Sequence, residues 1–208
     1  MSHTLGIRQA QKQKTRQALL DAALALLEDQ SLSSLGLREV TRAVGVAPTA
    51  FYRHFRSTAD LGVALVEEAL GSLHPTIRGI VAPDGESERR IERAVELIAG
   101  HVETHPAHVR FIARERHGGV QPVRAAIQDQ LALFGEEVKA ALAQDPVSAG
   151  WQEDDLRMLA HLYVDQMLVT ASLFLEALEG PEDARRQVAD DAIRRMRLIT
   201  LGRQHWLD

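Results

Sequence analysis

The chain has 208 residues, of which 45% are hydrophobic, 25% are charged and only 4% are aromatic. This balance supports a buried core rather than a disordered chain, and the many Ala, Leu, Glu, Arg and Gln residues favour helices over strands. Cysteine is absent, which excludes disulfides and thiolate metal sites and fits a reducing cytoplasm. The composition therefore predicts an all-α, cytoplasmic protein.

The charge is distributed unevenly along the chain. Residues 1–56 carry eight Lys and Arg against four Asp and Glu, a net charge of +4, although the whole chain has a net charge of −5. The remaining residues are therefore strongly acidic. A basic head on an acidic body indicates a polyanionic partner that contacts the head alone.

The first 56 residues are predicted to form three helices. Leu20, Ala23, Leu24 and Leu27 lie at i, i+3, i+4 and i+7, on one face of a helix over residues 15–29. A Ser-rich linker follows. Two shorter helices, separated by a turn at Gly45 and with Pro48 opening the second, are expected over residues 37–44 and 48–55.

The rest of the chain is predicted to form six more helices, separated by Gly and Pro breakers. The first begins near Thr58, where Ser57 and Asp60 resemble a capping box, is kinked at His74–Pro75 and ends at Pro83–Gly85. The others are expected over residues 86–104, 106–117, 122–144, 153–179 and 182–202. Polar side chains interrupt the most apolar window, at 158–175, which argues against a membrane span.

The segment Leu37–Phe55 has the spacing of a helix-turn-helix unit, in which a small apolar cluster locks two helices so that the second can enter a major groove of DNA. The cluster is expected to contain Val40, Val44, Val46, Phe51 and Phe55. Arg and Tyr suit phosphates, and Thr and Ala methyl groups can touch thymine. The residues expected to contact DNA are Lys14 and Arg16 in a basic arm, and Arg38, Thr49, Ala50, Tyr52, Arg53 and His54 in the unit. An ordinary helical hairpin is the alternative.

The segment Leu37–Leu61, with AFYRHF at Ala50–Phe55, resembles the DNA-binding head of TetR-type repressors. The chain is more similar still to the branch of FabR- and DesT-like regulators of unsaturated fatty-acid synthesis and acyl desaturation. The residues that carry this second likeness are APTAFYRHF at Ala47–Phe55, Asp60–Gly62, ARERHGG at Ala113–Gly119 with Arg124, and MRLITLGRQHW at Met196–Trp206.

The resemblance implies a nucleoid-associated transcriptional regulator, expected to be a repressor of lipid-metabolism genes. It implies a homodimer on a pseudo-palindromic operator, with a long-chain acyl-CoA as the effector in the body. Two positions depart from the family: Gly36 stands where Ser or Thr often caps the second helix, and Thr58 stands where many members have a phosphate-binding Lys. Glycine at the cap should cost only about a few tenths of a kcal/mol.

The helix expected over residues 153–179 is apolar nearly all round, so it should be buried on several faces. One face of this helix can pack in the core of its own chain and another against a partner subunit. The last helix of each chain would then complete a four-helix dimer interface. The residues expected in the dimer interface are Leu162, Val169, Leu173, Ile193 and Met196. A central core helix in a monomer is the alternative.

A ligand cavity is expected in the body, although each lining residue could also be plain core. The expected apolar lining is Leu97, Phe111, Phe134, Met167 and Phe174. Arg114 and Arg116, with Arg110 nearby, are candidates for binding the phosphates of coenzyme A, because Arg pairs bidentately with phosphate. Surface ion pairing is an equally good interpretation of these arginines.

No catalytic residues, cofactor or metal site are predicted. His101, His105 and His108 lie at i, i+4 and i+7, but Pro106 interrupts the helix between them. We divide the chain into a DNA-binding domain at 1–56 and a ligand-binding and dimerisation domain at 57–208. Two other functions stay open: a regulator of efflux or detoxification that senses a hydrophobic or cationic molecule, and a helical lipid-binding carrier.

Overall fold

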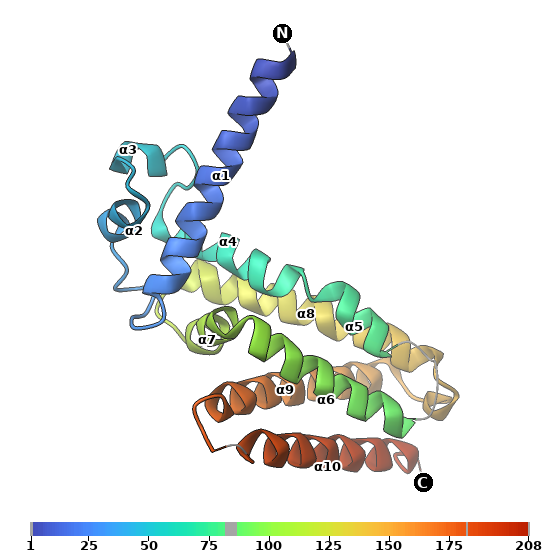
Figure 1. Cartoon of the computed structure of the whole chain (residues 1–208). Coiled ribbons are helices and arrows are strands. Elements are labelled where there is room, and N and C mark those ends of the chain that lie inside the picture. Colours follow the sequence, from blue (N-terminus) through green and yellow to red (C-terminus); the bar gives the residue numbers. More distant parts are fainter. Residues whose placement is uncertain (1, 82–86, 182, 208) are drawn as a thin grey trace.

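The structure is a computed structural model that describes residues 2–81, 87–181 and 183–207, with a small helical head at one end of an elongated helical body (Figure 1). The described residues contain ten α-helices, one 3-10 turn and no strand, which confirms the all-α prediction. The head contains α1 (Ser2–Leu26), α2 (Leu37–Val44) and α3 (Pro48–Phe51). The body contains α4 (Thr58–Gly71), α5 (His74–Val81), α6 (Ser87–Thr104), α7 (Pro106–Glu115), α8 (Gln121–Gln144), η1 (Pro146–Ser148), α9 (Glu153–Ala177) and α10 (Ala184–Gln204).

The helix predicted from Thr58 onward is two helices. The N–H of Ser72 bonds to the carbonyl of Leu70, which ends α4, and α5 begins at His74. Pro75 lacks an amide hydrogen and so suits the first turn of a new helix, which makes the expected kink a break. The predicted end of this helix at Pro83–Gly85 lies outside the described residues.

Helix α1 begins at Ser2 and not near Thr15. Thr15 does not cap the helix, because its Oγ1 donates to the carbonyl of Gln11 (3.0 Å) inside the helix. Residues 8–14 are all Gln, Lys, Arg or Ala, which are good helix formers, so the helix extends toward the N-terminus at one hydrogen bond per residue. Lys12 and Lys14 therefore lie on a protruding helix instead of a loose arm (Figure 1).

A single hydrophobic core runs from the head into the body. Val40 of α2 and Phe51 of α3 are fully buried in it, as are Leu61 and Leu65 of α4. Because α4 belongs to both parts of this core, a shift of α4 would be transmitted to the head. A second, smaller cluster lies between α6, α9 and α10.

Candidate nucleic-acid interface and ligand cavity

The turn between α2 and α3 is built on Gly45. Its φ is 72°, a left-handed conformation that glycine adopts readily, and its N–H donates to the carbonyl of Arg42 (3.1 Å). The N–H of Val46 donates to the carbonyl of Thr41 (3.0 Å). These bonds close the C-terminus of α2 and fix the direction in which the chain enters α3.

The predicted apolar cluster of the helix-turn-helix unit is present. Val40, Phe51 and Phe55 are buried, with the two phenyl rings 5.5 Å apart, and Val44 and Val46 pack against them. Helix α3 is shorter than predicted, since the chain after Phe51 continues as a turn. The N–H of Phe55 still bonds to the carbonyl of Phe51 (3.0 Å), so the phenylalanine anchor holds this turn in place.

The residues predicted to contact DNA are distributed over α1, the start of α2, and α3 with its following turn, which form the outer end of the molecule (Figure 1). Tyr52 is 63% exposed although it is aromatic, and Phe51 beside it is fully buried. The exposed members of the set are Lys14, Arg38, Thr49, Tyr52 and Arg53, and the half-buried members are Arg16, Ala50 and His54.

Positive charge gathers around His54. Burial lowers the pKa of His54 below its ordinary 6.5, and the nearby charges of Lys12, Arg16 and Arg53 lower it further. The guanidinium of Arg16 also stacks over the Phe55 ring, 5.0 Å from its centroid, which joins α1 to the end of the helix-turn-helix unit. The fold thus brings basic side chains from α1 and from the turn after α3 to one place, as binding to a polyanion requires.

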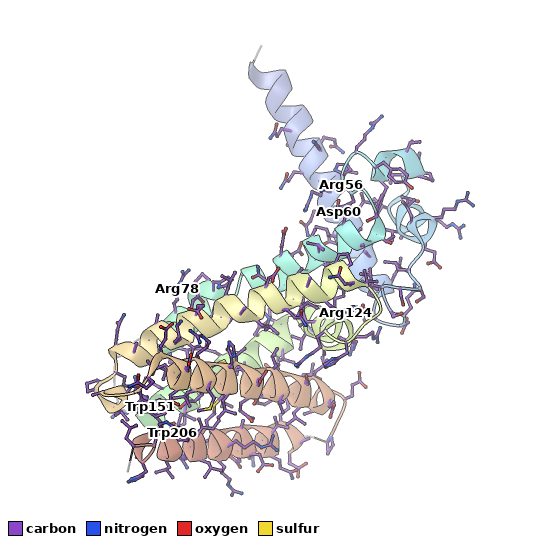
Figure 2. The ribbon with its side chains drawn as sticks, turned by 180° about the vertical axis from the view of Figure 1, so that it is seen from behind. Arg56, Asp60, Arg78, Arg124, Trp151 and Trp206 are labelled. Carbon is purple, nitrogen blue, oxygen red and sulfur yellow. The ribbon has the colours of Figure 1, made fainter. Side chains whose placement is uncertain are left out.

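The start of α4 is capped beside this unit, where Figure 2 places Arg56 and Asp60. Ser57 Oγ accepts the N–H of Asp60 (3.1 Å), and Asp60 Oδ2 accepts the N–H of Arg56 (2.9 Å). The helix start predicted here from the sequence is therefore correct. In a standard capping box the carboxylate would accept the N–H of Ser57, but here Asp60 accepts the N–H of Arg56, one residue earlier. At α2, Glu39 Oε2 accepts the N–H of Gly36 (2.9 Å), so half of a box remains where the capping side chain is missing.

An apolar cavity of about 470 Å³ lies between α5, α6, α8 and α9. Leu97, Phe134 and Met167, three of the residues expected around a ligand, line this cavity. Its volume is in the range of small-molecule sites, and its wall is mostly aliphatic. A smaller hollow of about 80 Å³ on the side of α4 and α7 shares His101 with it and includes Arg116.

Two of the predicted lining residues lie outside this cavity, although Phe174 lines a separate hollow of about 410 Å³ between α6, α9 and α10. Phe111 is buried in the main hydrophobic core, and Phe174 packs with Val95 and Val102 in the second cluster. Neither borders the large cavity. The sequence could not distinguish a cavity-lining residue from a core residue, because both are apolar side chains with the same spacing along a buried helix.

The predicted arginine cluster is not brought together at the cavity. Arg114 Nη1 donates to the carbonyls of Leu27 and Gln30, each at 2.7 Å, and Nη2 donates to the carbonyl of Glu28 (3.0 Å). The guanidinium thus caps the C-terminal end of α1, where carbonyl groups lack helical partners. The assignment of Arg114 to a ligand head group is wrong.

Arg110 and Arg116 also separate from each other. Arg110 pairs with Glu28 (3.5 Å) and Glu179 (3.3 Å), which is the surface ion pairing that the sequence left as the alternative. Arg116 alone remains next to a hollow of the body.

A polar group that the sequence analysis missed closes the other end of the body. Arg203 Nη2 and Arg90 Nη2 lie 3.2 Å and 3.5 Å from Asp145 Oδ2, and Arg203 also donates to Ser148 Oγ (2.7 Å). Burial by itself would raise the pKa of Asp145, but the N–H of Val147 and the two arginines outweigh it and hold that pKa below its ordinary value. Asp145 is therefore ionised at neutral pH. These residues come from three separate segments, so no local sequence pattern joins them.

The three histidines of the predicted helix end lie together despite Pro106. The rings of His101 and His105 are 4.8 Å apart and stacked, and those of His105 and His108 are 5.9 Å apart. Burial, followed by the charges of the other two histidines, lowers the pKa of His101. Within the described ranges, no group of three or more His, Cys, Asp or Glu side chains could hold a metal ion.

Helices α9 and α10 carry an exposed apolar surface. Leu162 on α9 is 48% exposed and Leu198 on α10 is 71% exposed, while Leu173 and Ile193 are half-buried. Val169 of the predicted interface is exposed too. Met196 was predicted to contact a partner, but it is only 2% exposed because it points into the body, so this prediction is wrong.

Helix α9 is, among the described residues, long and apolar enough by length and composition to cross a membrane. Only 28% of its most apolar window is buried within the chain. The core helix of a soluble protein can pass the same test. The low buried fraction shows that the chain itself leaves apolar surface of α9 uncovered.

Residues 19–65 match the family described as bacterial regulatory proteins, tetR family. A protein of Clostridium perfringens named as a fatty acid metabolism regulator has the same fold, with a TM-score of 0.67 and 14% identity over 86% of this chain and 96% of that one. NalD of Pseudomonas aeruginosa, the secondary repressor of the MexAB-OprM multidrug efflux pump, aligns with a TM-score of 0.65 and 20% identity over 89% and 96%. AibR, solved with isovaleryl coenzyme A and operator DNA, aligns with a TM-score of 0.64 and 17% identity over 86% and 95%.

Proposed function

Because residues 19–65 carry the N-terminal domain of the tetR family of bacterial regulatory proteins, we propose that the chain is a sequence-specific DNA-binding repressor. The observation that carries this proposal is the helix-turn-helix unit, in which Phe51 and Phe55 are buried while Thr49, Tyr52 and Arg53 remain at the surface. Such a unit presents its second helix to a major groove, with basic side chains on the flanking phosphates.

The regulator acts as a homodimer on a pseudo-palindromic operator. A helix-turn-helix dimer binds two half-sites about 34–36 Å apart, so the two heads must be held at a fixed spacing. The exposed apolar surface of α9 and α10 supplies a face for this contact, since water-exposed leucines on two adjacent helices favour burial against a second copy. We divide the chain into a DNA-binding domain at 1–56 and a dimerisation and ligand domain at 57–208, acting in the cytoplasm.

The effector is an acyl chain bound in the cavity between α5, α6, α8 and α9, with a long-chain acyl-CoA as the first ligand to test. An aliphatic wall suits an alkyl chain, because each buried methylene contributes about 0.8 kcal/mol. AibR binds an acyl-CoA and the Clostridium protein is named for fatty acid metabolism, so relatives in fold support this ligand class. The genes under control would then be those of fatty-acid and lipid metabolism.

The DNA-binding proposal is tested by selecting bound duplexes from a random pool and measuring their affinity by fluorescence anisotropy at several salt concentrations. We expect nanomolar binding to a selected palindrome and a steep loss of affinity as salt rises. Equal affinity for selected and scrambled duplexes at low salt would contradict it and would favour a lipid carrier.

The effector is tested on the protein–operator complex. Saturated and unsaturated acyl-CoAs are titrated into it while anisotropy is followed, with cationic dyes as the parallel series. A response to acyl-CoA alone supports the proposal, whereas a response to dyes alone would make the chain an efflux-type regulator, the class of NalD.

A further inference from the structure

The hollow of about 80 Å³ beside α4 and α7 adjoins the large cavity of the body. The two spaces share part of their walls, and the common lining residues are Leu70, Leu73, His101, Leu168 and Ala171. All of these side chains are apolar except that of His101. An apolar chain in the large cavity therefore lies next to the hollow, with His101 at the boundary.

The titratable side chains that line the hollow are all bases. They are Arg116 at the end of α7, His108 on α7 and His101 on α6, and no Asp or Glu belongs to the described lining. His108 is already paired, since its Nε2 lies 3.4 Å from Glu68 Oε1. Among the described residues that line the large cavity, the carboxylate of Glu96 is the only charged group. The hollow, and not the large cavity, therefore suits a negative charge.

Arg116 is the cation of the hollow that remains available to a ligand. It is half-buried, and its guanidinium has no hydrogen-bond acceptor or ion-pair partner among the described residues. The other two arginines of α7 are occupied: Arg110 pairs with Glu28, and Arg114 donates to the carbonyls at the end of α1. A guanidinium binds carboxylate and phosphate oxygens through short, charge-assisted hydrogen bonds.

His101 offers a second, uncharged hydrogen bond at the boundary. Its ring stacks on that of His105, but its nitrogens bond to no described residue. Burial, followed by the charges of His105 and His108, lowers the pKa of His101 below 6.5. The ring is therefore neutral above about pH 6.5, where one of its nitrogens carries a proton that it can donate.

We propose that the hollow between Arg116 and His101 binds the oxyanion end of an amphipathic ligand whose apolar chain lies in the large cavity. Arg116 neutralises the charge, and His101 donates to the ligand oxygen that lies nearer the chain. This inference rests on the proposed function and specifies the chemistry of its effector. The oxyanion can be the carboxylate of a free long-chain acid or a phosphate of an acyl-CoA.

Arg116→Gln removes the charge. It should weaken the binding of an anionic ligand at least tenfold, the size expected for one charge-assisted hydrogen bond. Arg116→Lys keeps the charge without the planar fork and should restore part of the affinity. Arg78→Gln is the matched control, because Arg78 is an exposed arginine paired with Glu137 (3.4 Å) that lines neither space.

His101→Leu removes the uncharged donor and keeps an apolar wall. It should weaken the binding of an anionic ligand about two- to tenfold, as for one neutral hydrogen bond. His117→Leu is its control, since His117 is exposed and lines neither space. An unchanged affinity for the anionic ligand in His101→Leu would overturn the role of His101.

Binding is measured on the full chain without DNA, by isothermal titration calorimetry. The probes are dodecanoate, lauroyl-CoA and the uncharged methyl dodecanoate, which carry the same acyl chain. We expect Arg116→Gln to weaken one or both anionic probes and to leave the ester unchanged. A loss of dodecanoate affinity identifies a carboxylate as the group that Arg116 binds, and a loss with lauroyl-CoA alone identifies a phosphate.

A purely structural role for Arg116 predicts a different pattern. If Arg116→Gln weakens all three probes, ester included, or if it alters neither anionic probe, the anion site is overturned. The effector cavity of the proposed function stands in both cases, because the probes still bind the unmodified protein. If the unmodified protein binds none of the three probes, the acyl-chain effector fails together with the anion site.

Discussion

Glu115 and Leu32 join the body to the head through a buried hydrogen bond. The carboxylate Oε1 of Glu115, at the end of α7, accepts the N–H of Leu32 at 2.8 Å, in the loop that follows α1. Glu115 is only 1% exposed and Leu32 is buried beside it. Since the peptide N–H of Leu32 is buried away from water, it needs a hydrogen-bond acceptor within the protein. Glu115 supplies that acceptor and so holds the loop in place.

Glu115→Ala is expected to lower the free energy of unfolding by about 1–3 kcal/mol, because it leaves the buried N–H of Leu32 without an acceptor. Urea denaturation followed by circular dichroism measures the change. Glu153→Ala, at an exposed glutamate of α9, is the control and should stay within about 0.5 kcal/mol. A loss of equal size in both variants would show that the bond to Leu32 contributes little.

Gly118→Ala tests the space around the same carboxylate. A Cβ at residue 118 would collide with Glu115 Oε2 and crowd the backbone of Glu115. We expect the unfolding free energy to fall by about 1–3 kcal/mol, as for overpacking in a close-packed site. Gly79→Ala, in α5 with open space around it, should instead raise the stability by about 0.5–1 kcal/mol. Thermal melts of the two variants should therefore shift in opposite directions.

Arg114→Ala is expected to weaken the head rather than ligand binding. Its guanidinium satisfies three carbonyls at the end of α1, so its loss should cost about 1–3 kcal/mol of unfolding free energy and reduce operator affinity. Acyl-ligand affinity, measured by calorimetry at a temperature where the variant is folded, should be unchanged. Arg114→Lys should restore only part of the stability, because one ammonium cannot reach three carbonyls in a fork geometry.

The contrast between Arg114 and the helix-turn-helix unit shows which features a sequence can predict. Gly45, Pro48, Val40 and Phe51 act within a few residues of one another, so turn chemistry and apolar spacing were enough to place them. The bonds of Arg114 reach carbonyls up to 87 positions away, and its partners are backbone atoms that leave no mark in the residue types. Its role could be read only from the folded chain.

The same limit applies to the body. The apolar character of α9 was evident from its residues, but which face is covered depends on α6, α8 and α10. The packing of α9 leaves Leu162 exposed, whereas on α10 the contacts with α6 and α9 cover Met196, of the same hydrophobic class. The polar group at Arg90 and Arg203 depends on three segments meeting, and it was missed for the same reason.

Arg53→Ala is expected to weaken operator binding and to lower the salt slope. An arginine on a phosphate releases about one counterion, so the slope of log affinity against log salt should decrease by about one. Anisotropy titrations at several salt concentrations give this slope. The same substitution at Arg78, on α5 in the body, should leave both affinity and slope unchanged (Figure 2).

Stability should fall on acidification because of His101. Its pKa in the folded chain is lowered below 6.5, so the unfolded chain binds a proton more readily. Its contribution is therefore fully present above about pH 6.5 and is lost as the pH falls below that value toward the lowered folded pKa. Urea titrations at pH 7.5 and 5.5 should show the loss, and His101→Gln should reduce it, while the exposed His117→Gln should leave it intact.

The dimer interface is tested by placing charge on its exposed leucines. Leu162 and Leu198 lie at the surface of α9 and α10, so Leu162→Glu and Leu198→Glu should not disturb the core of the chain itself. In a dimer each would bury an unpaired carboxylate, which costs several kcal/mol and should shift the protein to monomers in analytical ultracentrifugation. The operator affinity should fall with it, since one head alone contacts only half a palindrome.

Leu133→Glu on α8 is the matched control for this experiment, because Leu133 is also an exposed leucine but lies on neither α9 nor α10. It should remain dimeric and bind the operator normally. An unmodified protein that sediments as a monomer at the concentration used for DNA binding would rule out the α9–α10 dimer. Dissociation by Leu133→Glu with no effect of the other two variants would instead place the interface on α8.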